Sequence, residues 1–172
     1  DFTAEVERSL RVLDGCVCVF DAQKGVEDQS ETVWRQANKY SVPRLVLVNK
    51  MDVVGANFAH CLTQIRDRLD GLPVPVTIPI GSGPPKDSST PFKGIIDLLA
   101  MKAIYYEAAD QGKSFRVEEI PAENLEEARR YHEELFDVLT RSDDKDRITS
   151  LTPEAQEIPL DTVRAVIREQ TI

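Results

Sequence analysis

Hydrophobic residues in the first 70 positions of this chain recur with two different periods. Apolar side chains at helical spacing in 2–13, 28–40 and 57–69 predict three amphipathic helices. Between them, continuous apolar runs at 16–20 and 44–48 predict buried strands, the first of them covered on both faces. Helices and strands that alternate through short connections favour a parallel, doubly wound α/β sheet. Only two strands of that sheet fall within this sequence.

The pattern changes near 70–73. Residues in 74–80 and 115–120 alternate and are rich in β-branched side chains, and further β-type runs lie in 94–106. The segment 81–91 has no periodicity and is rich in Gly, Pro and Ser, which predicts a loop. Because a meander of strands differs from the alternation before it, we predict that an α+β subdomain begins at this change.

A long charged helix is predicted over 122–140, followed by an irregular polar segment at 141–158 and a final helix at 161–172. The apolar face of the long helix holds Leu125, Ala128, His132, Leu135 and Leu139. Its outward face holds Glu126, Glu127, Glu133 and Glu134. An acidic face of this kind is ordinarily a solvated surface, and the alternative is a docking surface for another protein.

Composition and charge narrow the classes of function. The 172 residues carry a formal net charge of −9, and their Lys and Arg residues are scattered, so no direct contact with nucleic acid is expected from this piece. No apolar run approaches membrane-spanning length, which predicts no membrane partner. Cys16, Cys18 and Cys61 have no zinc spacing and are expected to be small buried residues in a reducing cytoplasm. No metal ligand is predicted.

The most specific chemistry lies in Asn49-Lys50-Met51-Asp52, which follows the second predicted strand. Open α/β sheets bind ligands at the carboxyl ends of their strands. The Asp52 carboxylate can accept two hydrogen bonds from the N1–H and the exocyclic amine of guanine, a pair that adenine does not offer. Asn49 can reach the base edge and tie neighbouring loops, and the Lys50 stem can cover the ring face. This position in the chain favours guanine binding over an ordinary polar turn.

Several other polar or aromatic residues have simpler interpretations. Asp21 ends the first predicted strand at the same edge, and we expect it to have a structural role in the adjoining loop. Trp34 is interpreted as a packing residue of its helix, and His132 as a hydrogen-bonded core histidine. His60 has no third ligand and no nucleophile nearby in the sequence, and Asp1 is expected to be a helix N-cap. No catalytic residue is predicted in this chain.

Longer stretches of the sequence resemble translation elongation factor G. The first of them begins Phe2-Thr3-x-Glu5-Val6-Glu7-Arg8-Ser9 and the second includes Gln29-Ser30-Glu31-Thr32-Val33-Trp34-Arg35-Gln36-Ala37. The segments that carry the resemblance are 2–15, 19–21, 25–37, 48–52, 55–56, 79–81, 92–97, 128–135 and 167–168. The resemblance therefore covers essentially the whole chain and identifies it as a fragment of a longer protein.

The resemblance implies a division of the chain and a set of ligands. Residues 1–70 would be the second half of a GTP-binding (G) domain, 71–160 an inserted subdomain, and 161–172 a helix that returns to the G domain. The parent protein would be a GTP hydrolase that binds GTP or GDP with Mg²⁺ and promotes ribosomal translocation of tRNA and mRNA. Its partners would be the ribosome and, through 71–160, the ribosomal stalk protein.

The fragment alone is predicted to be inactive. A phosphate-binding loop needs Gly-x-x-x-x-Gly-Lys-[Ser/Thr], and the only Gly-rich stretch, 81–86, has the wrong spacing and two prolines that remove donors. The family's catalytic His segment and its Ser-Ala guanine loop have no counterpart in these residues. Because phosphate and metal contacts carry most of GTP hydrolysis, we expect no tight nucleotide binding and no hydrolysis by this piece.

Two alternatives to an elongation factor G fragment come from different classes. The first is a protein-interaction module built on 71–160. The second is a paralogous translational GTPase for ribosome recycling, release or ribosome protection, which would share the Asn-Lys-x-Asp element. The matches at 94–97 and 128–135 favour elongation factor G over release and protection factors.

Overall fold

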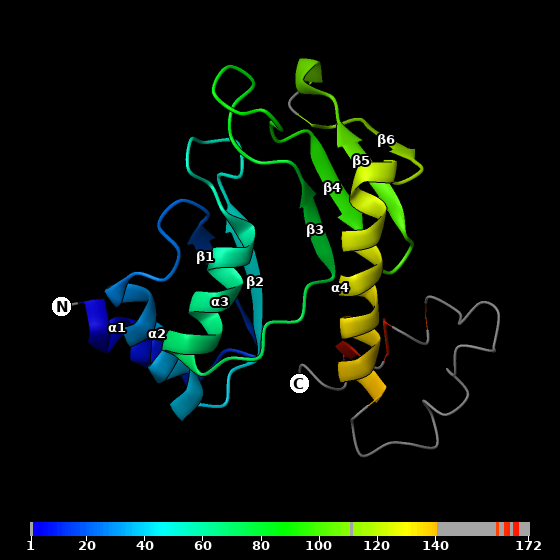
Figure 1. The fold of residues 1–172 in the computed structure, drawn as a ribbon. Coiled ribbons are helices and arrows are strands. Elements are labelled where there is room, and N and C mark those ends of the chain that lie inside the picture. The colour runs from blue at the N-terminus through cyan, green and yellow to red at the C-terminus, as the bar shows by residue number, and fades with distance from the viewer. Residues whose placement is uncertain (1, 111, 141–160, 162–163, 166, 169–172) are drawn as a thin grey trace. The chain divides into compact units, whose positions relative to one another are not determined.

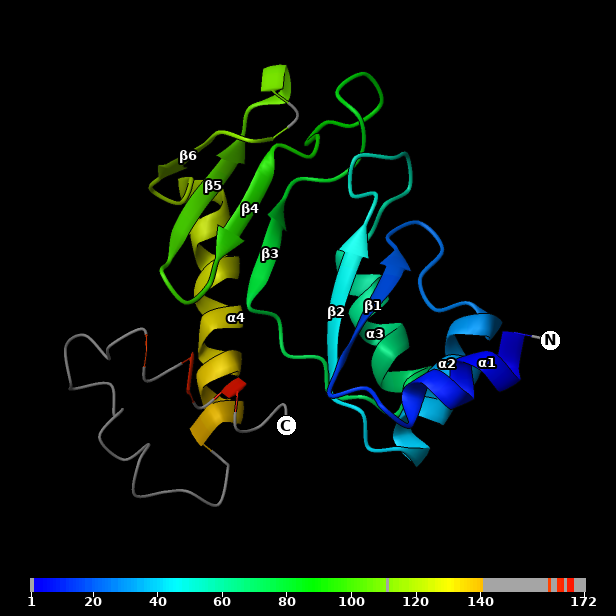
Figure 2. The same ribbon diagram turned by 180° about the vertical axis from the view of Figure 1, so that it is seen from behind.

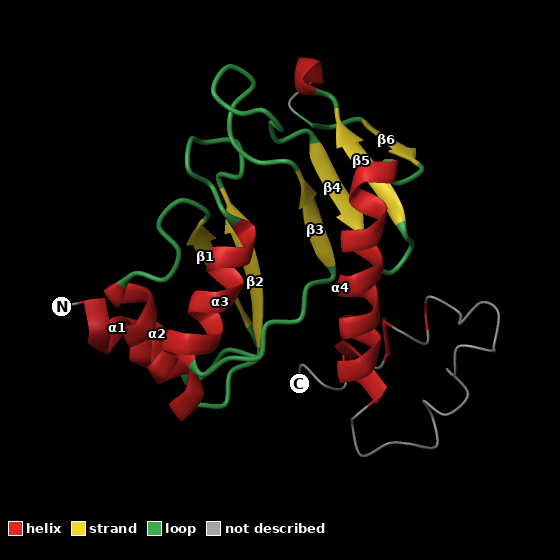
Figure 3. Ribbon diagram, in the orientation of Figure 1, coloured by secondary structure: helices red, strands yellow, loops and turns green. Residues whose placement is uncertain are grey.

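The computed structural model describes residues 2–110, 112–140, 161, 164–165 and 167–168, and it separates them into two compact units (Figure 1). The first unit holds the described residues up to Pro73 together with Ser82–Pro91. The second unit holds Val74–Gly81 and the described residues from Phe92 onward. The predicted mixed α/β class is confirmed, with a parallel sheet in one unit and an antiparallel sheet in the other (Figure 3).

The first unit alternates helices and strands as predicted. Its elements are α1 (Phe2–Leu10), β1 (Cys16–Asp21), α2 (Asp28–Lys39), β2 (Arg44–Asn49) and α3 (Phe58–Leu69). The two strands pair in parallel and in register, so that β1 and β2 begin and end side by side (Figure 2). α1 is shorter than predicted, because the N–H of Val12 turns back to the Ser9 carbonyl at 3.1 Å and Leu13 remains 43% exposed.

The core of the first unit lies between the sheet and its helices. Phe20, Val26, Trp34, Ile65 and Leu69 form one buried cluster, against which the half-buried Cys18 and Val46 pack. The Trp34 ring lies 6.3 Å from the Phe20 ring and 4.2 Å below the Arg44 guanidinium. Trp34 is therefore a packing residue, as expected.

The opposite face of this sheet is exposed. Val17, Val19, Leu45 and Leu47 are 52–61% exposed. The prediction that β1 is buried on both faces is therefore wrong for the part of the chain that the structure describes. The helices of the unit pack on the Cys18 side, and no described element of this unit covers the other side. Cys16 and Cys18 share the helix-covered face, and burial raises the pKa of the Cys18 thiol to about 11.

The second unit is a four-stranded antiparallel meander with one long helix. The strand order is β3 (Thr77–Ile80), β4 (Gly94–Asp97), β5 (Lys102–Tyr106) and β6 (Phe115–Glu118), with a single 3₁₀ turn at Ala108–Asp110. α4 (Ala122–Thr140) lies along the sheet of its unit (Figures 1 and 2). Gly94 is required in β4, since a Cβ there would overlap the carbonyl oxygen of Ile104 on β5.

The two faces of α4 match the predicted pattern. Ala128, Leu135 and Leu139 are buried, and the four glutamates of the acidic face, Glu126, Glu127, Glu133 and Glu134, are exposed. His132 Nδ1–H donates to the Leu98 carbonyl at 2.7 Å, so its interpretation as a hydrogen-bonded core histidine is confirmed.

Some predicted features lie outside the described residues. They are the N-cap role of Asp1, the segment 141–158 and much of the predicted helix 161–172. None of the described helices is long and apolar enough to cross a membrane.

Candidate nucleotide-binding site

The candidate site forms where β1 and β2 end. In the parallel register of the two strands, Asp21 pairs with Asn49, so the last residue of each strand lies beside that of the other. The backbone continues this pairing for one more step, since Ala22 N–H donates to the Asn49 carbonyl at 2.8 Å. The Asn-Lys-x-Asp loop therefore begins at the carboxyl edge of the sheet, where α/β folds bind ligands.

The loop begins with a sharp reversal of the backbone. Lys50 has a φ of 63°, in the left-handed region that few non-glycine residues adopt. Its N–H donates to the side-chain Oδ1 of Asn49 at 2.9 Å, which holds the reversal in place. Met51 follows as a buried residue, and its carbonyl accepts the Gly83 N–H at 2.8 Å. Buried Met51 thus ties the loop to the unit, while its neighbours stay at the surface.

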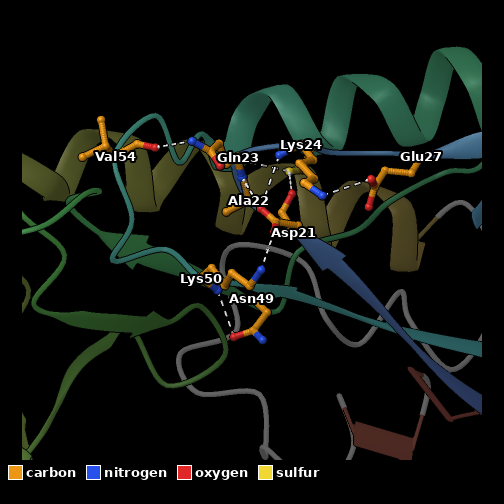
Figure 4. Close-up of polar contacts among 9 residues, drawn as sticks. Asp21, Ala22, Gln23, Lys24, Glu27, Asn49, Lys50 and Val54 are labelled. Carbon is orange, nitrogen blue, oxygen red and sulfur yellow. Dashed lines mark hydrogen bonds and ion pairs between the residues drawn. The ribbon is translucent and has the colours of Figure 1, made fainter.

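An ion pair joins this loop to the loop after β1 (Figure 4). Lys50 Nζ lies 2.7 Å from Asp21 Oδ2, and the side chains are 56% and 14% exposed respectively. Asp21 Oδ1 accepts the backbone N–H groups of Gln23 at 2.9 Å and Lys24 at 3.3 Å. The hydrogen bond from Lys50, followed by that from the Gln23 N–H, lowers the pKa of Asp21, and Asp21 raises the pKa of Lys50.

Two further hydrogen bonds join the same pair of loops. Gln23 Nε2 donates to the Val54 carbonyl at 2.9 Å, and Asn57 N–H donates to the Ala22 carbonyl at 2.8 Å. The loop after β1 therefore contacts the Asn-Lys-x-Asp loop at its start, through Lys50, and near its end, through Val54. The expected structural role of Asp21 in this loop is confirmed. Its partner, Lys50, was not indicated by the sequence.

α3 and its N-cap hydrogen-bond near both loops. Asn57 caps the helix by accepting the His60 N–H on its side-chain oxygen at 2.9 Å. Gln64 Oε1 accepts the Val26 N–H at 2.6 Å, and a Cβ on Gly25 (φ 71°) would overlap that same Oε1. His60 Nε2 lies 2.9 Å from Gln64 Nε2, so His60 belongs to this hydrogen-bonded support.

The three predicted guanine-reading residues differ in their surroundings. Asn49 and Lys50 are engaged within the loops, as described above. Asp52 is exposed, and its carboxylate makes no hydrogen bond or ion pair with any residue that the structure describes. Both of its oxygens are therefore free to accept hydrogen bonds from a ligand. The role of the three residues in reading guanine stays a prediction.

The described residues offer no metal site. Among them, no group of three or more His, Cys, Asp or Glu side chains could hold a metal ion. The Gly-rich segment at 81–91 is a loop, as predicted, and Ser82–Pro91 belongs to the first unit. The sequence did not indicate that this segment packs against the Asn-Lys-x-Asp loop through Gly83 and Met51.

The chain is similar to known proteins in family, in sequence and in fold. Residues 1–149 match the elongation factor Tu GTP binding domain. Elongation factor G from Wolbachia pipientis subsp. Culex pipiens (strain wPip) is 49% identical over 172 residues, which is 100% of this chain and 24% of that protein. A crystal structure of a protein from Thermus thermophilus has a TM-score of 0.78 and 24% identity over 99% of this chain and 24% of its own, which shows a shared fold. The chain thus spans about a quarter of the length of these relatives.

Proposed function

Because this chain belongs to the family of the elongation factor Tu GTP binding domain, we propose that it is part of a ribosome-dependent GTPase of the elongation factor G type. The observation that carries the proposal is the Asn-Lys-x-Asp loop at the carboxyl ends of two parallel strands, with the Asp52 carboxylate open to a ligand. The 49% identity to an elongation factor G over the whole chain supports the same assignment. It does not favour the recycling or release-factor alternative.

In this proposal each residue of the loop has a separate task. Asp52 accepts hydrogen bonds from the N1–H and the exocyclic amine of guanine. Lys50 covers one face of the base with its methylene stem while Asp21 holds its ammonium group. Asn49 keeps the reversal at Lys50 through its side-chain oxygen, and so it fixes the direction in which the loop continues toward Asp52.

The whole protein would bind GTP or GDP with Mg²⁺ and promote movement of tRNA and mRNA on the ribosome. Bound Mg²⁺ would neutralise charge on the phosphates, and the described residues of this chain do not fit it as ligands. We therefore assign base recognition to this piece and propose that the 172 residues alone do not hydrolyse GTP. The division into 1–70, 71–160 and 161–172 as parts of a G domain and its insert remains part of the proposal.

The test is a change of base preference in the whole protein. Asp52→Asn replaces one acceptor oxygen by a donor, which suits the O2 carbonyl of xanthine in place of the guanine amine. We expect GDP affinity to fall by roughly 5- to 150-fold, from the 1–3 kcal/mol of a bidentate base contact, while XDP affinity rises. Asp67→Asn on the exposed surface of α3 is the matched control. An Asp52→Asn protein that keeps its GDP preference would contradict the proposal.

A second role is proposed for the acidic face of α4. Glu126, Glu127, Glu133 and Glu134 are all exposed on a helix whose other face is buried. The exposed Arg130 lies among them and forms an ion pair with Glu127 at 3.9 Å, so the face is predominantly but not wholly acidic. In the elongation factor G family this insert is associated with the ribosomal stalk protein. Reversal of all four charges to Lys should weaken stalk binding and ribosome-stimulated GTP hydrolysis while nucleotide affinity stays unchanged. Unaltered stalk binding would contradict the docking role and indicate that this face is only a solvated surface.

A further inference from the structure

We propose that Asp21 is a positioning residue for base recognition: its carboxylate holds the Lys50 ammonium and thereby fixes the Asn-Lys-x-Asp loop in the shape that receives the base. This inference rests on the proposed function, since it names the residue that prepares the same site for its ligand. Asp21 acts through Lys50, which lies 2.7 Å away.

The carboxylate of Asp21 has a fixed direction. Its Oδ1 accepts two backbone N–H groups, from Gln23 and Lys24, which leaves Oδ2 for Lys50. The main-chain carbonyl of Asp21 also accepts the Gly25 N–H at 2.7 Å, so backbone and side chain are both tied into the turn. Only 14% of this side chain is exposed. A carboxylate with so few free orientations can define where a partner cation lies.

Among the described residues, Asp21 is the only polar partner of the Lys50 side chain. The Lys50 backbone lies in the left-handed region, and its side chain is 56% exposed, so more than half of the side-chain surface is in solvent. A free lysine side chain would lose considerable rotamer freedom when a base binds against it. The ion pair with Asp21 restricts the stem before the ligand arrives, and preorganisation of this kind improves affinity without a new contact to the ligand.

A second contact holds the far side of the same loop. Gln23, two residues after Asp21, donates to the Val54 carbonyl at 2.9 Å. The loop after β1 thus hydrogen-bonds to the Asn-Lys-x-Asp loop on both sides of Asp52, at Lys50 and at Val54 (Figure 4). Asp52 itself has no internal partner among the described residues. The position of Asp52 is therefore set by the contacts of Lys50 and Val54 on either side of it. Of these two contacts, the one from Asp21 to Lys50 is charged.

The proposal predicts a loss of affinity without a loss of base discrimination. Asp21 is placed to hold Lys50 and not to read the base edge, so its removal should weaken guanine and xanthine nucleotides by the same factor. By contrast, substitution of Asp52 should change the preference between them. The two residues therefore have distinct signatures in one binding assay.

The experiment measures equilibrium binding and dissociation of fluorescent GDP in the whole protein. Asp21→Asn keeps an Oδ1 for the two backbone N–H groups but presents an NH₂ to the Lys50 ammonium. Lys50→Met keeps an apolar stem and removes the ammonium. We expect each change to raise the GDP Kd about five- to tenfold, and the double variant to be no weaker than the weaker single variant. The control Glu27→Gln removes the same charge from the exposed Lys24–Glu27 pair in this loop and should leave Kd within about twofold.

Two results would overturn the positioning role. One is an Asp21→Asn protein that binds GDP as Glu27→Gln does. The other is an equal loss from Asp21→Asn in the Lys50→Met background, which would make Asp21 merely structural. If Asp21→Asn does not fold, the test rests on Lys50→Met, because the Lys50 side chain is exposed and its replacement should not unfold the protein. GDP binding by Lys50→Met within about twofold of wild type would then refute the proposal.

A parallel Asp52→Asn arm separates the two proposals. Failure of that variant to prefer XDP contradicts the proposed function. A successful switch, with Asp21→Asn lowering XDP affinity in the Asp52→Asn background by the factor seen for GDP, supports the positioning role. A successful switch combined with unchanged affinity in Asp21→Asn contradicts the positioning role alone.

Discussion

Removal of the Gln64 side chain should destabilise the first unit by detaching the loop after β1 from α3. Gln64 Oε1 accepts the backbone N–H of Val26 at 2.6 Å, and Val26 is only 2% exposed. In Gln64→Ala this buried donor loses its partner, which costs about 1–3 kcal/mol of unfolding free energy. The same loop carries Asp21, so GDP affinity of the whole protein should fall as well.

The assay is urea unfolding at constant temperature, with the transition followed by Trp34 fluorescence, since Trp34 lies in the core of the first unit. Gln64→Glu retains an acceptor oxygen at the same position and should lose less stability than Gln64→Ala. Gln29→Ala, at an exposed site on α2, is the matched control and should change stability by less than about 0.5 kcal/mol.

Gly25 provides an internal check on this reasoning. A Cβ at Gly25 would overlap Gln64 Oε1, and the φ of 71° adds strain for any other residue. Gly25→Ala should therefore be less damaging in the Gln64→Ala background than in the wild type, because the overlap is gone and the strain alone remains. Equal stability of Gln64→Ala and Gln29→Ala would refute the account of how the loop is held.

Three further predictions concern the second unit, the ion pair and the exposed sheet face. Ile96 is 0% exposed, so Ile96→Ala should lower the free energy of unfolding of the second unit by about 2–5 kcal/mol. Val117 is exposed, so Val117→Ala should have a small effect, and calorimetry of the two variants measures the difference. The pKa of Asp21 lies below its ordinary 3.8. The ionised Asp21 carboxylate therefore stabilises the folded protein fully above pH 3.8, and this stabilisation is lost as the pH falls through the lowered pKa. In Lys50→Met, NMR titration of the Asp21 carboxyl carbon should show its midpoint move up toward 3.8. Leu45 and Leu47 are 61% and 52% exposed, so their replacement by Thr in the chain alone should reduce self-association measured by light scattering, and unchanged association would remove this face as its cause.

Periodicity alone predicted most of the secondary structure, for a physical reason. Helices and strands here bury one side against a core, so their apolar residues recur at 3.6 or 2 positions, and β1, α2, β2, α3 and α4 all end within two residues of their expected limits. α1 differs because its last apolar residues, Val12 and Leu13, remain exposed and do not extend the helix. Periodicity reports that a residue is apolar and leaves open whether anything packs on it.

The same distinction explains the exposed face of β1 and β2. Val17 and Val19 have the composition of a strand covered on both sides, and a run of apolar residues contains no information about which neighbouring elements are present. The two cysteines on the other face were placed together correctly, because alternation along a strand fixes side independently of what covers it.

Contacts between distant loops were beyond the reach of sequence reasoning. The Asp21–Lys50 pair depends on the register of two parallel strands, and a shift of one residue would have pointed these side chains elsewhere. The sequence placed polar residues at one edge, where both strands end, but it did not indicate that Asp21 pairs with Lys50. The contact of Gly83 with Met51 had no comparable signal, since it brings a non-periodic loop back to residues far earlier in the chain.

The central claim is that Asp52 accepts the exocyclic amine of guanine, and IDP, which lacks that amine, tests it most directly. The measurement is competition of IDP and GDP for the whole protein and for its Asp52→Asn variant. A hydrogen bond to a charged group contributes about 1.5–3 kcal/mol, so wild type should prefer GDP over IDP by roughly 10- to 150-fold, and Asp52→Asn should lose most of that preference. Equal affinity of the wild type for IDP and GDP, or an undiminished preference in Asp52→Asn, would contradict the account.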